Sequence, residues 1–382
     1  MKSPISSLAA TLGRCRTYAQ PSLVSPAAWQ RLLALADRLP AALSSCLHFE
    51  CRPAAPEGQV DVILGIDEPG RELLRGDNPA LSLTNEVRRH PVWKRLATLC
   101  QSWHSDPRLG SQLNRLWIEC DLPDDGAEVP VPRIFLDLNR PPRDAREAAL
   151  HRRLVIELCE RFVGVPSPSS LRAGLDACWR VGDGHYLHSV GLAPDSEHPN
   201  YRLCVRCRDF SGLGHVLSAA GAAGTLETLR RQLLAADFPP DGALPSLLDL
   251  DLNADRAPAF GLEWSLPSAA AGRPAEQSLT LLRCLEQSGL LSTEALAALH
   301  LWPGSNVEQM SHQLWPSLLR RNINHIKIVY DRKGRPEAKI YLRFEHTLYR
   351  RQRSPHLSRR TDKALDALDE STGQDRAASR AS

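Results

Sequence analysis

Basic, aromatic and acidic side chains alternate with apolar ones along several short segments of this chain. In residues 113–122, Arg115, Trp117 and Glu119 share one face of a period-2 pattern, while apolar residues occupy the other face. Residues 337–345 show the same arrangement with Lys339 and Tyr341. A face that mixes aromatic rings with charged groups is more typical of a ligand pocket than of a surface in water. The segments are therefore predicted to be strands whose polar faces line a binding site.

The predicted strands come in pairs, each joined by a link rich in Pro, Gly, Asp or Asn, which indicates antiparallel hairpins. Five pairs follow one another along the chain: 48–52 with 60–67, 113–122 with 132–138, 185–192 with 201–209, 246–253 with 259–266, and 324–330 with 337–345. Successive hairpins begin about 60 to 77 residues apart, a spacing that indicates a repeat of supersecondary structure.

The stretches between these pairs have the apolar spacing of helices. The predicted helices are 27–39, 84–103, 146–162, 169–179, 212–221, 225–238, 275–289, 293–300 and 307–321. The second of them is expected to break before Pro91, because proline lacks the N–H that a helix interior needs. We expect residues 1–24 to be a poorly ordered N-terminal segment, 25–349 a single domain, and 350–382 a disordered basic tail.

The composition is that of a globular protein, with 42% hydrophobic and 24% charged residues among 382. A formal net charge of only +3 gives no overall signal for nucleic-acid binding. The ten cysteines fall mostly within apolar patterns, which indicates reduced, buried thiols. No segment has the features of a signal peptide or the roughly 18 apolar residues of a membrane span, so a cytoplasmic protein is expected.

Ten strands in sequential hairpins leave two arrangements open. An open sheet would cover its apolar face with helices and leave its polar face in water. Twisted sheets of that size tend to close or split, however, and Trp117 and Phe135 on the polar face favour a pocket. The fold class that we expect is α+β, with five consecutive αββα units. They would form a ten-stranded antiparallel barrel with a polar lumen wide enough for a ligand and an outer ring of helices.

This arrangement resembles the ABBA-type (PT-barrel) aromatic prenyltransferases, over roughly residues 25–345. The segment EAKIYLRF (337–344) is similar to the Lys-x-Tyr strands on which indole prenyltransferases bind the prenyl diphosphate, and FGLEW (260–264) sits in a comparable hairpin position. The resemblance implies an enzyme of secondary metabolite biosynthesis. Its reaction would transfer a prenyl group from a prenyl diphosphate to an indole, a phenol or a peptide-borne aromatic residue.

The same resemblance implies roles for side chains that face the lumen. Basic groups and one tyrosine would meet the charge of the leaving diphosphate with charge-assisted hydrogen bonds. These diphosphate-binding candidates are Arg115, Arg133, Arg202, Arg206, Lys327, Lys339, Tyr341 and Arg343. Trp117 and Phe135 would form the substrate pocket and shield the allyl cation. Glu119, with Glu263 as second choice, would accept the proton that the aromatic acceptor loses.

The sequence departs from the family pattern in two respects. The family usually rings the prenyl chain with several tyrosines, whereas this chain has six in all and only Tyr341 clearly points inward. Its polar faces also carry many aspartates, which repel a diphosphate unless a metal bridges them or they lie at the far rim. These are Asp61, Asp67, Asp121, Asp137, Asp249 and Asp251. Both departures favour the alternative of a non-catalytic barrel that binds a peptide or small molecule in natural-product biosynthesis.

The two hypotheses predict different surroundings for the basic side chains. A transferase needs them to converge on one space of diphosphate size, whereas a binding protein can pair each with a carboxylate. The resemblance requires no cofactor; magnesium stays an option, although no DDxxD motif occurs. Histidine and cysteine spacing predicts no metal site, and there is no P-loop, Rossmann or nucleophile-elbow motif. The expected partners are substrate molecules, with no nucleic acid and no membrane span, and the oligomeric state stays open.

Overall fold

The computed structural model describes residues 7–54, 59–77, 83–120, 122, 129–179, 185–194, 200–206, 210–219, 245–253, 256–266, 276–308, 316–330 and 335–348. The chain divides into two units, Met1–Asn306 with Leu318–Thr347, and Val307–Ser317 with Leu348–Ser382. The cavity and the side chains of the candidate site belong to the first unit.

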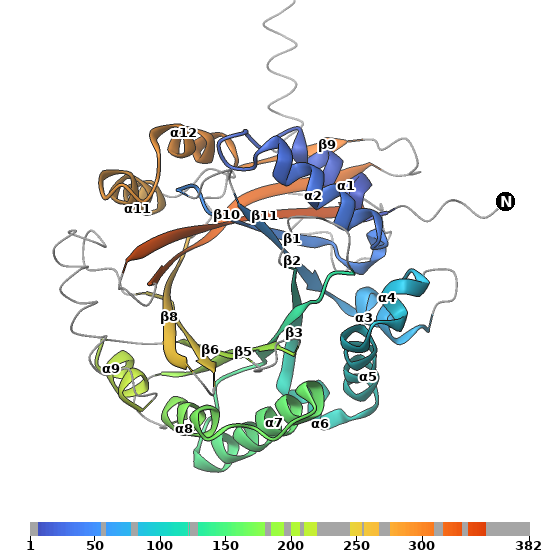
Figure 1. The fold of residues 1–382 in the computed structure, drawn as a ribbon, viewed down its shortest axis with the longest axis vertical. Helices are drawn as coiled ribbons and strands as arrows, with labels where there is room; N and C mark the ends of the chain where they lie inside the picture. The colour runs from blue at the N-terminus through green and yellow to red at the C-terminus, as the bar shows by residue number, and fades with distance from the viewer. Residues whose placement is uncertain are drawn as a thin grey trace, which may run out of the picture. The chain divides into compact units, whose positions relative to one another are not determined.

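Ten strands form the barrel. Their bounds are β1 (Cys46–Cys51), β2 (Val60–Ile66), β3 (Leu113–Cys120), β4 (Arg133–Leu138), β5 (Tyr186–Ala193), β6 (Asn200–Arg206), β7 (Leu247–Asn253), β8 (Arg256–Ser265), β10 (Ser317–Tyr330) and β11 (Pro336–Leu348). Each strand from β1 to β7 pairs antiparallel with the one that follows it, β8 pairs with β10, and β11 pairs with both β10 and β1. Because β11 has a partner on each side, the ring of strands closes (Figure 1). The predicted barrel is confirmed, and the open-sheet alternative is wrong.

Helices surround the ring of strands on its outer side (Figure 1). Their bounds are α1 (Leu8–Arg16), α2 (Pro26–Asp37), the 3-10 turn η1 (Ala41–Leu43), α3 (Glu68–Arg75), α4 (Asn85–Arg89), α5 (Pro91–Ser105), α6 (Pro107–Gln112), α7 (Ala145–Val163), α8 (Ser169–Cys178), α9 (Phe210–Ala219), α11 (Glu276–Gln287) and α12 (Thr293–Leu301). The predicted break before Pro91 is confirmed by the boundary between α4 and α5. Within the described part of the chain, no helix is both long and apolar enough to cross a membrane.

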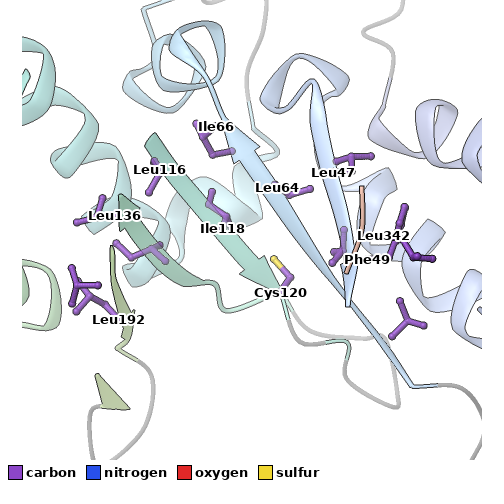
Figure 2. Close-up of a cluster of buried hydrophobic side chains, with 14 of the residues drawn as sticks. Leu47, Phe49, Leu64, Ile66, Leu116, Ile118, Cys120, Leu136, Leu192 and Leu342 are labelled. Carbon is purple, nitrogen blue, oxygen red and sulfur yellow. The ribbon is translucent and has the colours of Figure 1, made fainter. Parts of the chain in front are cut away.

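The apolar faces of the strands and the inner faces of the helices make one hydrophobic layer. Figure 2 shows part of it, with Leu47, Phe49, Leu64, Ile66, Leu116, Ile118, Cys120, Leu136, Leu192 and Leu342 labelled. Phe49 on β1 meets Trp29 on α2 edge to face, with 5.7 Å between ring centres. Fully burying side chains of this size contributes about 1.5–3 kcal/mol each, so this layer fixes which face of every strand turns away from the lumen.

The structure differs from the predicted elements in two places. Within the segment 1–24, for which the sequence predicts no ordered element, α1 buries Leu8, Leu12 and Cys15, which lie one helical turn apart. The helix predicted over 307–321 is wrong at both of its described ends: Val307 and Glu308 belong to β9 (Gly304–Glu308), and residues from Ser317 onward belong to β10. On β10 the buried residues Leu319 and Ile323 follow the alternation of a strand, because pairing within the sheet overrides local helix propensity.

Several predictions fall on residues that the structure does not describe. The helix predicted over 225–238, the tail from 350 onward, Asp121 and Cys207 lie outside the described residues. The nine cysteines that are described carry free thiols, and most of them are buried, as predicted.

Candidate functional site

The alternation of each strand decides which side chains enter the lumen. On β3, Leu116 and Ile118 are fully buried under the helices, so Trp117 and Glu119 point the other way. A cavity of about 220 Å³ lies inside the barrel, and side chains from all ten barrel strands line it. Eight of the predicted site residues are among them: Trp117, Glu119, Phe135, Arg202, Arg206, Glu263, Lys327 and Tyr341. Four others are not part of this lining: Arg115, Arg133, Lys339 and Arg343.

Two glycines give the aromatic walls their positions. The ring of Trp117 lies against Gly65 on β2, where a Cβ would come within 2.9 Å of Trp117 Cζ3. The ring of Phe135 lies against Gly191 on β5, where a Cβ would come within 2.6 Å of Phe135 Cε1. Each ring therefore occupies space that a side chain on the neighbouring strand would otherwise fill.

Each aromatic wall also carries a guanidinium group. Arg115 Cζ lies 5.1 Å from the centre of the Trp117 ring, and Arg202 Cζ lies 5.8 Å from the centre of the Phe135 ring. Trp117 Nε1 donates a 2.9 Å hydrogen bond to Asp137 Oδ2. These contacts orient both rings, and in each of them a cation of the protein itself lies over one face of the ring.

Carboxylates accompany most of the predicted diphosphate ligands. The five ion pairs are Arg133 with Glu119, Arg202 with Asp251, Lys327 with Asp249, Lys339 with Glu50, and Arg343 with Glu345. The hydroxyl group of Tyr341 also donates a hydrogen bond to Glu50. Within the described part of the chain, Arg115 and Arg206 have no carboxylate at ion-pair distance. The eight candidates therefore do not converge as a group on one space, and three of the basic ones, Arg202, Arg206 and Lys327, share the cavity wall.

Glu50 shows most clearly how the structure uses the predicted Lys-x-Tyr strand. Both Lys339 and Tyr341 donate to its carboxylate, and Arg52 donates a third hydrogen bond at 2.9 Å. Burial raises the pKa of Glu50, but Lys339 and Arg52 outweigh this effect and hold the pKa well below its usual range. The carboxylate is therefore ionised, and it accepts hydrogen bonds from three side chains.

A second buried group joins β7, β8 and β10. Lys327 pairs with Asp249, and its Nζ lies 3.9 Å from Glu263 Oε1. Burial raises the pKa of Asp249, but Lys327 and Arg202 lower it to about 2. Burial and the negative charge of Asp249 instead raise the pKa of Glu263 well above its usual value. The pair thus separates into an ionised Asp249 and a Glu263 that favours its protonated form, which makes Glu263 a proton donor rather than a ready base.

His325 completes this wall of the cavity. Burial and the charge of Lys327 lower the pKa of His325 to about 3, so its imidazole is neutral. Its ring stacks on Tyr341 with 3.8 Å between ring centres, and its Nδ1 lies 2.8 Å from the side-chain amide nitrogen of Asn324. Because that amide nitrogen donates, the remaining proton of the imidazole sits on Nε2, which lies 3.8 Å from Glu263 Oε2.

Sequence reasoning missed Glu50, Asp249 and His325 as site residues. Asp249 carries a visible signal, since it alternates with apolar residues on β7, but the sequence analysis treats such aspartates only as a departure from the family. Asp67 is not on the lumen face as expected; it caps α3, where its side chain accepts from the Gly70 N–H. Among the residues that the structure describes, no cluster of histidine, cysteine, aspartate or glutamate has an arrangement that could hold a metal ion.

No family model matches this chain, and no curated protein matches it. Several solved structures are similar to it. A 6-dimethylallyltryptophan synthase from Micromonospora olivasterospora is 14% identical at a TM-score of 0.49, over 88% of this chain and 95% of that one. A 5-dimethylallyltryptophan synthase from Streptomyces coelicolor is 16% identical at 0.46, over 88% and 97%. AnaPT from Neosartorya fischeri is 13% identical at 0.44, over 90% and 93%. The assignment of a closed barrel rests on the strand pairing of this chain itself.

Proposed function

We propose that the lumen of this barrel transfers a prenyl group from a prenyl diphosphate to an aromatic acceptor. The observation that carries the proposal is one cavity inside the closed ring of strands, whose wall combines aromatic rings, basic groups and buried carboxyls. Trp117 and Phe135 supply the rings, Arg202 and Lys327 the positive charge. A reaction that separates an allyl cation from a diphosphate needs all three kinds of group in one space shielded from water.

The chemistry balances with these groups. The bond between the prenyl carbon and the diphosphate oxygen breaks, and both of its electrons leave with the diphosphate. Arg202, Arg206 and Lys327 would stabilise that charge. The electron-rich ring of the acceptor then forms a bond to the allyl cation and loses one proton. A carboxylate receives this proton, and Glu119 is the first candidate because it is ion-paired with Arg133 and lines the cavity.

A second function is favoured by one specific observation, the pairing of the lumen cations with carboxylates. Pairing of this kind leaves little net positive charge for a diphosphate and gives the wall alternating donors and acceptors. Such a wall suits a neutral or zwitterionic peptide or small molecule that the barrel holds without chemical change.

Product formation separates the two functions. The full chain is incubated with dimethylallyl diphosphate and L-tryptophan, because a dimethylallyl diphosphate analogue and tryptophan are the ligands in the complex of the similar Micromonospora enzyme. A panel of indoles, phenols and tryptophan-containing peptides with geranyl diphosphate extends the test, with magnesium and with a chelator in parallel. A product heavier by one prenyl unit, seen by mass spectrometry, is the expected result. No product from any combination, together with tight binding of an unprenylated acceptor, would establish the second function instead.

A further inference from the structure

Two acidic residues on one strand hold two of the cations of the cavity wall. Asp249 and Asp251 stand two positions apart on β7, in register with Cys204 and Arg202 of β6, so both side chains face the lumen. Asp249 pairs with Lys327, and Asp251 pairs with Arg202. Among the five ion-paired cations that the sequence assigned to diphosphate binding, these two line the cavity. One strand therefore controls the charge that an incoming anion meets there.

In the contact between Arg202 and Asp251, the aspartate carboxylate occupies the position at which the arginine could bind another anion. Arg202 Nε donates to Asp251 Oδ1 at 2.6 Å, and Nη2 donates to Oδ2 at 2.9 Å. An arginine binds a phosphate group with the same two-point fork. The guanidinium of Arg202 also lies over the ring of Phe135. This contact does not involve Asp251, so it can keep the guanidinium in the lumen when the ion pair is broken.

The two aspartates differ in how freely they can move. The side chains of Asp249 and Lys327 are 4% and 2% exposed, so separating them would leave an unpaired charge in the interior. The side chain of Asp251 is 27% exposed and that of Arg202 is 12% exposed. Asp251 can therefore turn toward water while Arg202 stays in place.

We propose that Asp251 is an internal competitor for the anion site on Arg202, and that a diphosphate enters the cavity by displacing this carboxylate. The inference rests on the proposed function and concerns the same site, whose affinity for the diphosphate group Asp251 would lower. In the absence of a ligand, the Asp251 carboxylate neutralises and orients Arg202. An incoming anion must therefore bind Arg202 more strongly than this carboxylate does. Asp251, whose charge by itself repels a diphosphate, then sets the affinity of the site for it.

The test is a calorimetric titration of inorganic diphosphate into the full chain, without divalent metal. The variant D251N removes the charge and keeps the shape, and D251A removes the carboxylate altogether. The matched control is D176N, because Asp176 on α8 is also ion-paired with an arginine, Arg152 on α7, on the outer side of the barrel. We expect both Asp251 variants to bind diphosphate about tenfold tighter or more than the wild type, because Arg202 is released. D176N should stay within about twofold of the wild type, since its arginine is remote from the lumen.

Two outcomes would overturn the competition. One is an unchanged or weaker affinity in both D251N and D251A. The other is a gain that persists in the double variant R202Q/D251N, because the released charge would then not be that of Arg202.

The product assay keeps this inference distinct from the proposed function. Prenyl transfer by the wild type, with no gain of affinity in the Asp251 variants, overturns the competition alone. A gain of affinity in a protein that forms no product supports the competition and overturns prenyl transfer.

Discussion

Lys327 passes across Gly261 of the neighbouring strand to reach Asp249 on the strand beyond. Gly261 stands in register with Asp249 on one side and with Val329 on the other. A Cβ at Gly261 would come within 2.5 Å of Lys327 Cε and 3.1 Å of Val329 Cγ1. Because Gly261 has no side chain, the lysine of β10 can cross β8 and pair with the aspartate of β7. The ion pair therefore requires a glycine at position 261.

Replacing Gly261 by alanine should therefore displace Lys327. We expect G261A to lower the free energy of unfolding by about 1–3 kcal/mol, because the added methyl group overpacks a buried and ion-paired neighbour. Urea unfolding measures the change. G13A is the control, since a Cβ at Gly13 in α1 would meet nothing within 4 Å. Equal stabilities of the two variants would contradict the close approach.

The pair of Lys327 and Asp249 should behave as one unit in a double-mutant cycle. Each single variant, K327M or D249N, leaves an unmatched buried group and should cost about 3–5 kcal/mol of unfolding free energy. The double variant removes both charges and should cost clearly less than the sum of the single changes. Additive losses in urea unfolding would show that the two side chains are independent.

His325 should make the protein less stable as the pH falls. Its pKa in the folded chain is about 3, held down by burial and then by Lys327, against an ordinary value near 6.5 in the unfolded chain. Below pH 6.5 this histidine therefore takes up a proton in the unfolded chain but stays neutral in the folded chain. The free energy of unfolding that is present above pH 6.5 is lost as the pH falls. Between pH 7 and pH 5, the free energy of unfolding of H325Q should fall by about 2 kcal/mol less than that of the wild type, as measured by urea unfolding at each pH.

Variant H104Q, at an exposed position at the end of α5, controls for the loss of a histidine. Matching pH profiles for H325Q and the wild type would refute the assignment.

Trp117 offers a test of the aromatic wall within the proposed reaction. W117F keeps a ring that can shield a cation but loses the hydrogen bond to Asp137, whereas W117L keeps bulk and loses the ring. Because cation–π attraction in a water-poor site is worth up to about 2 kcal/mol, W117L should turn over up to about thirtyfold more slowly than W117F. Quantified product by mass spectrometry gives the rates, and urea unfolding shows whether both variants fold. Equal rates in two folded variants would remove Trp117 from the proposed shielding role.

The faces of the strands could be predicted from the sequence, because a strand alternates its side chains over a distance of two residues. On β4, Ile134 and Leu136 are fully buried in the outer layer, while Phe135 and Asp137 line the cavity, as their spacing indicates. The start of β10 could not be predicted in this way. Paired leucines and arginines at 318–321 look like a helix locally, and only pairing within the sheet makes them a strand.

Which charges meet inside the barrel was decided by the tertiary structure alone. Lys339 contacts Glu50 from 289 positions away, and Lys327 contacts Asp249 from 78 positions away. Alternation puts all of these groups in the lumen, but it says nothing about which strands become neighbours or how far each one is shifted. Closure of β11 onto β1 and the register of β6, β7, β8 and β10 determine that. The sequence by itself therefore determined a polar lumen of basic, acidic and aromatic groups. Only the folded barrel paired its cations with carboxylates, because ionic contacts act over a few ångströms and depend on positions that long-range strand pairing sets.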